Sequence, residues 1–195
     1  MKQRITYDSK IGNDIKTLGK EIFDLAQMDM NKNYLMHRGV STYEHCVSVA
    51  YVALMRARKS SHPEKIDERS LVRGALLHDF FLYDWHTHVS WHRLHGYRHP
   101  RFAYNNACFY LHSKLNRKER DIIIHHMFPL TIIPPLSKEA WIVTFADKTC
   151  ADFEHRYQKT IVDLSELFPN EILNRTQEIK LKKQAQFAEV QKKKA

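Results

Sequence analysis

The spacing of apolar residues constrains the fold most, because it repeats every three to four positions along much of the chain. Between residues 14 and 27 this spacing is typical of an amphipathic helix. Ser41 and Glu44 match a capping box that opens a helix, and this helix is predicted to run to about Ala57. Further helices are predicted over residues 68–81, 101–115, 117–127 and 137–159, and after Asn170.

The signal for β-strands is weak. The β-branched run 122–124 lies inside a charged, capped helical segment, and no alternating run is bounded by hairpin turns. With 195 residues, 43% of them hydrophobic and only five Gly, the chain is long enough for one packed domain. We therefore predict an all-α domain, in which a long histidine-rich connection spans residues 83–100.

Cysteine content and hydropathy bear on the cellular setting. The three cysteines, Cys46, Cys108 and Cys150, form neither a disulfide pattern nor a zinc-thiolate motif. No apolar run is long enough to span a membrane, and the first residues lack the apolar stretch of a secretory signal. We expect a cytoplasmic protein without a membrane partner.

The chain is basic, with 31 Lys and Arg against 22 Asp and Glu and a net charge of +9. Residues 176–195 hold six Lys and two Glu, which accounts for four of these nine charges. We interpret this segment as a solvated tail rather than a nucleic-acid-binding arm. The remaining charge favours a small anionic substrate over nucleic acid, and a homo-oligomer is compatible with the sequence.

Ionisable residues lie on the apolar faces of three predicted helices. His45 is followed by Val49 and Val52 on its own face, and small or apolar residues flank His78 and Asp147 in the same way. Asp79 directly follows His78. Burial of two imidazoles and two carboxylates is costly, whereas a divalent cation satisfies all four groups. The set therefore predicts a metal site.

These residues carry a resemblance to a known family. His45, then His78-Asp79 in LLHDF, then Asp147 in FADKT resemble the H…HD…D signature of the HD-domain metal-dependent phosphohydrolases. The resemblance covers residues 34–156 and implies an HD-domain helical bundle, as in small bacterial HD proteins. It divides the chain into an N-terminal helical segment (1–33) packed on the core, an HD domain (34–159) and a C-terminal helix with a basic tail (160–195), all within one structural domain.

Extra histidines resemble those of the binuclear branch of this family. They are His99, which precedes Pro100, and the pair His125-His126. The resemblance implies one ion held by His45, His78, Asp79 and Asp147. A second ion would share Asp79 and take His99 with His125 or His126, with a slight preference for His125. Iron or manganese suits this ligand set, and zinc, cobalt, nickel and magnesium stay open.

The resemblance also implies the chemistry. Two ions would hold a bridging water as hydroxide and clamp a phosphate, so Asp79 is assigned a catalytic role. Lys148, which follows Asp147, is a candidate for catalysis and for substrate binding, and Asp84 is a candidate for proton transfer. The other candidates for substrate binding are Arg38, Arg98 and Arg101. The expected substrate is a phosphoester of a nucleotide or of a small phosphorylated metabolite.

Two departures from the family pattern leave the activity open. The sequence HDFFLYDW lacks the glycine and lysine that often follow the HD pair, and no GYP motif follows His126. Cyclic-di-GMP hydrolysis is therefore less favoured. The alternatives are a di-iron oxygenase of HD type and a catalytically silent module that binds a nucleotide. In the histidine-rich connection, His86, His88, His92 and His95 with Trp85, Trp91 and Tyr97 are interpreted as an aromatic lid.

Overall fold

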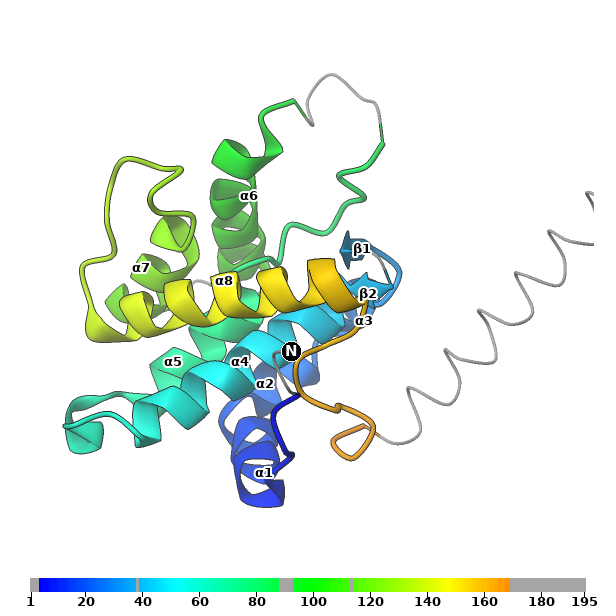
Figure 1. The fold of residues 1–195 in the computed structure, drawn as a ribbon. Coiled ribbons are helices and arrows are strands. Elements are labelled where there is room, and N and C mark those ends of the chain that lie inside the picture. Colours follow the sequence, from blue (N-terminus) through cyan, green and yellow to red (C-terminus); the bar gives the residue numbers. More distant parts are fainter. Residues whose placement is uncertain (1–3, 38, 88–92, 113, 169–195) are drawn as a thin grey trace, which may run out of the picture.

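Helices form nearly all of the regular structure, so the predicted all-α class is confirmed (Figure 1). The structure is a computed structural model and describes residues 4–37, 39–87, 93–112 and 114–168. The helices are α1 (Ser9–Leu18), α2 (Lys20–Phe23), α3 (Ala26–Met30), α4 (Thr42–Arg58), the 3-10 helix η1 (Pro63–Lys65), α5 (Glu68–Leu77), α6 (His95–Tyr110), α7 (Arg117–His125) and α8 (Lys138–Tyr157). None of the described helices is long and apolar enough to cross a membrane.

Helix α4 is the central element of the fold. Thirteen of its 17 residues are buried, because small and apolar residues occupy almost its whole circumference. Helices α5 and α8 pack against α4, and α7 packs against both α5 and α8. Figure 1 shows α1 and α2 at one end of this bundle and α6 and α7 at the other. The ligand-type residues thus lie on helices that share one core.

A glycine sets how closely α5 approaches α7. A Cβ atom on Gly74 would lie 2.5 Å from Cδ1 and 2.9 Å from Cβ of Ile122, which is closer than packed carbons allow. Each of these residues is followed, four positions later, by a histidine that caps the end of its helix. The two histidines, His78 and His126, therefore end up with ring centroids 4.9 Å apart.

The predicted helix over residues 14–27 is divided in the structure. Helix α1 begins earlier than predicted, because Asp8 caps it through the backbone N–H of Lys10, and it ends at Leu18. Gly19 leaves the helical conformation there, and a Cβ on it would lie 2.5 Å from Cδ1 of Leu76. The apolar stripe still faces the core, where Ile15 and Ile22 are fully buried.

Helix α6 begins six residues before the predicted start and ends before the predicted end. The last part of the histidine-rich connection is helical from His95, so Pro100 lies within the helix rather than at its first turn. Pro100 cannot donate to the carbonyl of Gly96, but this costs only one bond close to the helix start. The terminal helix predicted after Asn170 lies outside the described residues.

A short hairpin precedes α4. Its strands β1 (Leu35–His37) and β2 (Val40–Ser41) pair antiparallel. Gly39 in the turn has a φ of +80°, which glycine adopts without strain, and a Cβ there would lie 2.8 Å from the carbonyl oxygen of Gln158. Strands of three and two residues are too short for an alternating pattern, so the sequence did not predict them. Figure 1 shows the hairpin beside the C-terminal end of α8.

Candidate metal centre

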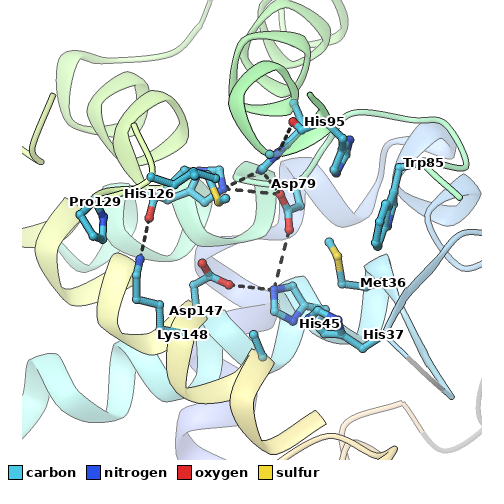
Figure 2. Close-up of a pocket in the computed structure, with 15 residues that line it drawn as sticks. Met36, His37, His45, Asp79, Trp85, His95, His126, Pro129, Asp147 and Lys148 are labelled. Atoms are coloured by element: carbon cyan, nitrogen blue, oxygen red, sulfur yellow. Dashed lines mark hydrogen bonds and ion pairs between the residues drawn. The ribbon is translucent and has the colours of Figure 1, made fainter. Parts of the chain in front are cut away.

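Six histidine and aspartate side chains from different parts of the bundle converge at one point. Figure 2 shows four of them, His45, Asp79, His126 and Asp147. The six are His45 of α4, His78 at the end of α5, Asp79 directly after it, His99 of α6, His126 at the end of α7 and Asp147 of α8. Five of them are buried, and the side chain of Asp147 is 13% exposed. The inward directions predicted for His45, His78 and Asp147 from their helix faces are thus found in the fold.

Asp79 lies between two groups of histidines. Its Oδ2 is 3.2 Å from Nε2 of His78 and 3.8 Å from Nε2 of His45. Its Oδ1 is 3.1 Å from Nε2 of His99 and 3.6 Å from Nε2 of His126. On the first side, Oδ1 of Asp147 is 3.1 Å from Nε2 of His45. Each carboxylate oxygen of Asp79 therefore faces a different pair of imidazoles.

All four imidazoles turn Nε2 toward this centre and use Nδ1 in an outward hydrogen bond. Nδ1 of His78 donates to Ala75 O (2.7 Å), Nδ1 of His99 to His95 O (3.0 Å), Nδ1 of His126 to Ile123 O (2.9 Å) and Nδ1 of His45 to Glu154 Oε2 (2.8 Å). Carbonyl and carboxylate oxygens only accept, so each Nδ1 carries the proton. In the neutral ring, Nε2 then presents a lone pair to the centre, as in histidines that bind metals.

Four of these inward atoms are poorly satisfied without a cation. Nε2 of His99 and Nε2 of His126 lie 2.9 Å apart, where one of them must carry a proton unless a cation lies between them. Within the described residues, Nε2 of His78 and Oδ1 of Asp79 are buried without a hydrogen bond. A cation between these atoms would remove both problems at once, because it accepts lone pairs from nitrogen and oxygen together. The residues therefore fit a metal ion.

The charges in the cluster shift the pKa values of its members in opposite directions. Burial and the charges of His78 and His99 lower the pKa of His126 to about 3, so its ring is neutral near pH 7. Burial opposes ionisation of Asp147, but the hydrogen bond from His45 and the charge of His78 outweigh it and lower the pKa to about 2. Burial likewise disfavours a charged His45, yet the carboxylates of Glu154 and Asp147 raise its pKa well above the ordinary value. Without a cation, Nε2 of His45 therefore carries a proton, and a metal ion at this position would replace that proton.

Comparison with known families gives a match over this same region. The family model for the HD domain matches residues 42–152, which is more than half of the chain. The chain belongs to the HD-domain family. This membership indicates a protein of metal-dependent phosphohydrolase type, with which the His/Asp cluster is compatible. No curated protein and no solved structure matches the chain at a significant level.

Within the HD domain, the adjacent residues His125 and His126 have different surroundings. His126 is 1% exposed and faces Asp79 and His99. His125 points elsewhere, with Nδ1 2.6 Å from Oδ1 of Asp121 on the same helix. This geometry favours His126 as the ligand, against the slight preference for His125 drawn from the sequence. The physical reason is that α7 ends between the two residues and turns only the second toward the centre.

A cavity of about 620 Å³ opens over the cluster. Lys148 lines it and donates from Nζ to the carbonyl oxygen of His126 at 3.1 Å, and burial lowers the pKa of this lysine. Figure 2 shows Trp85 and Met36 on one side of the cavity and Pro129 and Lys148 on the other. The remaining walls are mainly apolar.

Three other candidates lie outside the residues that line this cavity. Asp84 is exposed and accepts from the backbone N–H of His86 at 3.0 Å, as a loop residue does. Arg98 and Arg101 are also exposed, and the guanidinium of Arg98 lies 5.9 Å from the ring centre of Phe102. The structure therefore does not bring these three to the cluster. Arg38, predicted to bind substrate, lies outside the described residues.

Two polar residues of the HD-domain site, Glu154 and His37, were not among the site residues predicted from the sequence. Glu154 is fully buried on α8 and accepts the proton of Nδ1 of His45. His37 of β1 lines the cavity, and its Nε2 is 3.9 Å from Oε2 of Glu154. A signal for Glu154 was present, because it follows Asp147 by seven residues and so lies on the same helix face.

Proposed function

We propose that this protein is a metal-dependent phosphohydrolase that cleaves a phosphoester of a nucleotide or of a small phosphorylated metabolite. One observation carries the proposal: each carboxylate oxygen of Asp79 faces a separate pair of Nε2 atoms. This arrangement suits a carboxylate that bridges two divalent cations, which is how many phosphate-cleaving sites are built.

The two sides of Asp79 define two ligand sets. One ion would be held by His45, His78, Asp79 and Asp147, and the other by Asp79, His99 and His126. Mixed nitrogen and oxygen ligands of this kind suit iron or manganese. The outward hydrogen bonds from Nδ1 fix the orientation of each ring, so a cation enters a site whose ligands already point inward.

The residues around the cluster would bind the phosphate and protonate the leaving group. When bound, the two ions would lower the pKa of a water molecule and neutralise charge on the phosphate. Nζ of Lys148 uses one N–H for the carbonyl of His126 and keeps two for a phosphate oxygen. Because burial lowers its pKa, this ammonium group gives up a proton more readily, which suits protonation of the leaving alcohol.

Hydrolysis of a panel of phosphoesters tests this proposal, measured as released phosphate or, for cyclic dinucleotides, as the linear dinucleotide. Purified protein loaded with Mn²⁺ or Fe²⁺ is assayed with nucleoside mono-, di- and triphosphates, sugar phosphates and cyclic dinucleotides. We expect hydrolysis that a chelator abolishes and that Asp79→Ala removes together with the bound metal. Asp84→Ala is the matched control, since Asp84 is an exposed aspartate outside the cavity, and it should keep full activity.

Two results would contradict the proposal. One is metal-dependent hydrolysis that survives in Asp79→Ala. The other is oxygen consumption without phosphate release, which would indicate the di-iron oxygenase instead.

A further inference from the structure

Glu154 is a buried carboxylate with an unusual place beside the cluster. It is 0% exposed, and its Oε2 lies 2.8 Å from Nδ1 of His45. Within the described residues, its Oε1 is buried without a hydrogen bond. An ionised carboxylate taken out of water and only partly satisfied destabilises a fold, so its presence here calls for a role other than stability.

Two side chains of α8 contact the two ring nitrogens of His45. Asp147 and Glu154 are seven residues apart, about two helical turns, so both side chains leave α8 on the same face. Oδ1 of Asp147 is 3.1 Å from Nε2 of His45, and Oε2 of Glu154 is 2.8 Å from Nδ1. The ring therefore has one nitrogen at the cluster and the other at Glu154, and it cannot rotate without losing a contact.

We propose that Glu154 is a positioning residue for the metal centre, and this inference rests on the proposed function. Its carboxylate keeps the proton of His45 on Nδ1 and so keeps the lone pair of Nε2 directed at the ion that His45, His78 and Asp147 share. A carboxylate also makes the imidazole a stronger donor than a carbonyl does, because its negative charge increases the electron density of the ring. The other three histidines have carbonyl partners, so this effect belongs to His45 alone.

A third ion at Glu154 is the competing explanation. Ligand-type atoms of His37, His45 and Glu154 lie within 4.8 Å of one another. However, His45 would then need a lone pair on Nδ1 while its Nε2 serves the main cluster. A neutral imidazole has one lone pair in the ring plane, so the two uses exclude each other. The 2.8 Å contact between Nδ1 and Oε2 is the length of a charge-assisted hydrogen bond, which agrees with a proton between them.

A positioning role and a purely structural role predict different effects of Glu154→Met. Methionine removes the charge and leaves Nδ1–H of His45 buried without its acceptor, so the fold without metal should melt at a lower temperature in either case. If Glu154 positions His45, the affinity of one ion should also fall about 10–100-fold while the other stays near the wild-type value. A purely structural residue would affect both sites alike.

The test is a calorimetric titration of full-length protein, stripped of metal by a chelator, with Mn²⁺. Elemental analysis counts the bound ions, and thermal melts in excess chelator measure the stability of the fold without metal. Wild type is expected to bind two ions. Glu154→Met should lower the Mn²⁺ affinity of one site and leave that of the other near the wild-type value. Glu154→Gln retains an acceptor oxygen, so the affinity of its weakened site should lie between the values for wild type and Glu154→Met. Asp152→Asn on the same helix is the matched control, because Asp152 pairs with Arg156 and not with the cluster. It should change neither quantity.

Each outcome separates the inference from the proposed function. Wild-type affinity for both ions in Glu154→Met would overturn the role of Glu154. If wild type binds neither Mn²⁺ nor anaerobic Fe²⁺, the proposed function itself fails. If both sites weaken equally, the specific link to the His45 ion is refuted.

Discussion

The chemistry of a histidine is decided by its immediate surroundings, as His125 and His126 show. His126 is buried, and its low pKa keeps the ring neutral, so a lone pair is available at Nε2. His125 instead hydrogen-bonds Asp121 and takes part in the connection between two helices. Adjacent residues point about 100° apart on a helix, and here Nδ1 of His125 contacts Asp121 while Nε2 of His126 faces His99 in the cluster. Which one does so depends on where α7 ends, and the sequence predicted that end two residues too late.

Lys148 is expected to act on the substrate rather than on the fold. Removal of its ammonium group in Lys148→Ala deletes a hydrogen-bond donor from the cavity, and loss of one such donor typically lowers turnover by about 100-fold. We therefore predict that kcat/KM for the best phosphoester falls by about two orders of magnitude while metal content stays at the wild-type level. Lys138→Ala serves as the control, because Lys138 is exposed on the same helix. An unchanged kcat/KM in Lys148→Ala would remove this residue from the mechanism.

At the level of elements, helix ends supply the ligands that lie next to each other in sequence. His78 caps α5 and Asp79 follows where the helix has already ended. Side chains of adjacent residues project about 100° apart on a helix, so His78 and Asp79 reach the same centre from different directions. His126 caps α7 in the same way. Close packing of α5 and α7 is therefore a condition for assembly of the site.

The contact between Gly74 and Ile122 can be tested by a double-mutant cycle. Gly74→Ala places a methyl group where Cβ and Cδ1 of Ile122 already lie, so the helices must separate. We predict a loss of about 1–3 kcal/mol in the free energy of unfolding and weaker binding of the metal. Ile122→Ala should cost less in the Gly74→Ala background than in wild type, as measured by urea unfolding. If the two substitutions change the free energy of unfolding additively, this contact does not set the distance between α5 and α7.

Asp121 connects α7 to the start of α8, and its contribution should depend on pH. Burial raises its pKa, but hydrogen bonds from Ser137, His125 and the backbone of Leu136 outweigh burial and lower it below the ordinary 3.8. A lowered pKa in the folded state stabilises the protein above the unfolded pKa, and this stability is lost as pH falls through the folded value. Asp121→Asn should therefore cost about 1–2 kcal/mol near pH 7.

The difference between wild type and Asp121→Asn should begin to shrink below about pH 4, where the carboxyl of the unfolded chain binds a proton, and it should shrink further as the pH falls through the lowered pKa of the folded state. Urea unfolding in chelator at several pH values measures this, and chelator removes any contribution from bound metal. An equal difference at pH 3 and at pH 7 would contradict the assignment of the effect to ionised Asp121.

At the level of the whole molecule, the sequence predicted the parts of the site that depend on helix faces. The directions of His45, His78 and Asp147 follow from apolar neighbours at helical spacing, and the all-α class follows from the same pattern. Contacts between helices that are distant in sequence could not be predicted in this way, because helix periodicity does not show which other helix packs against an apolar face. The bond between Glu154 and His45 spans 109 positions and is an example.

The count of metal ions per chain tests the central claim most directly. Elemental analysis of protein reconstituted with Mn²⁺ or Fe²⁺ and freed of excess metal should give two ions per wild-type chain, because each carboxylate oxygen of Asp79 faces a separate pair of imidazoles. His99→Ala removes a ligand from only one of these sets and should reduce the count to one. A single ion in wild type, or two in His99→Ala, would contradict a centre in which Asp79 bridges two ions.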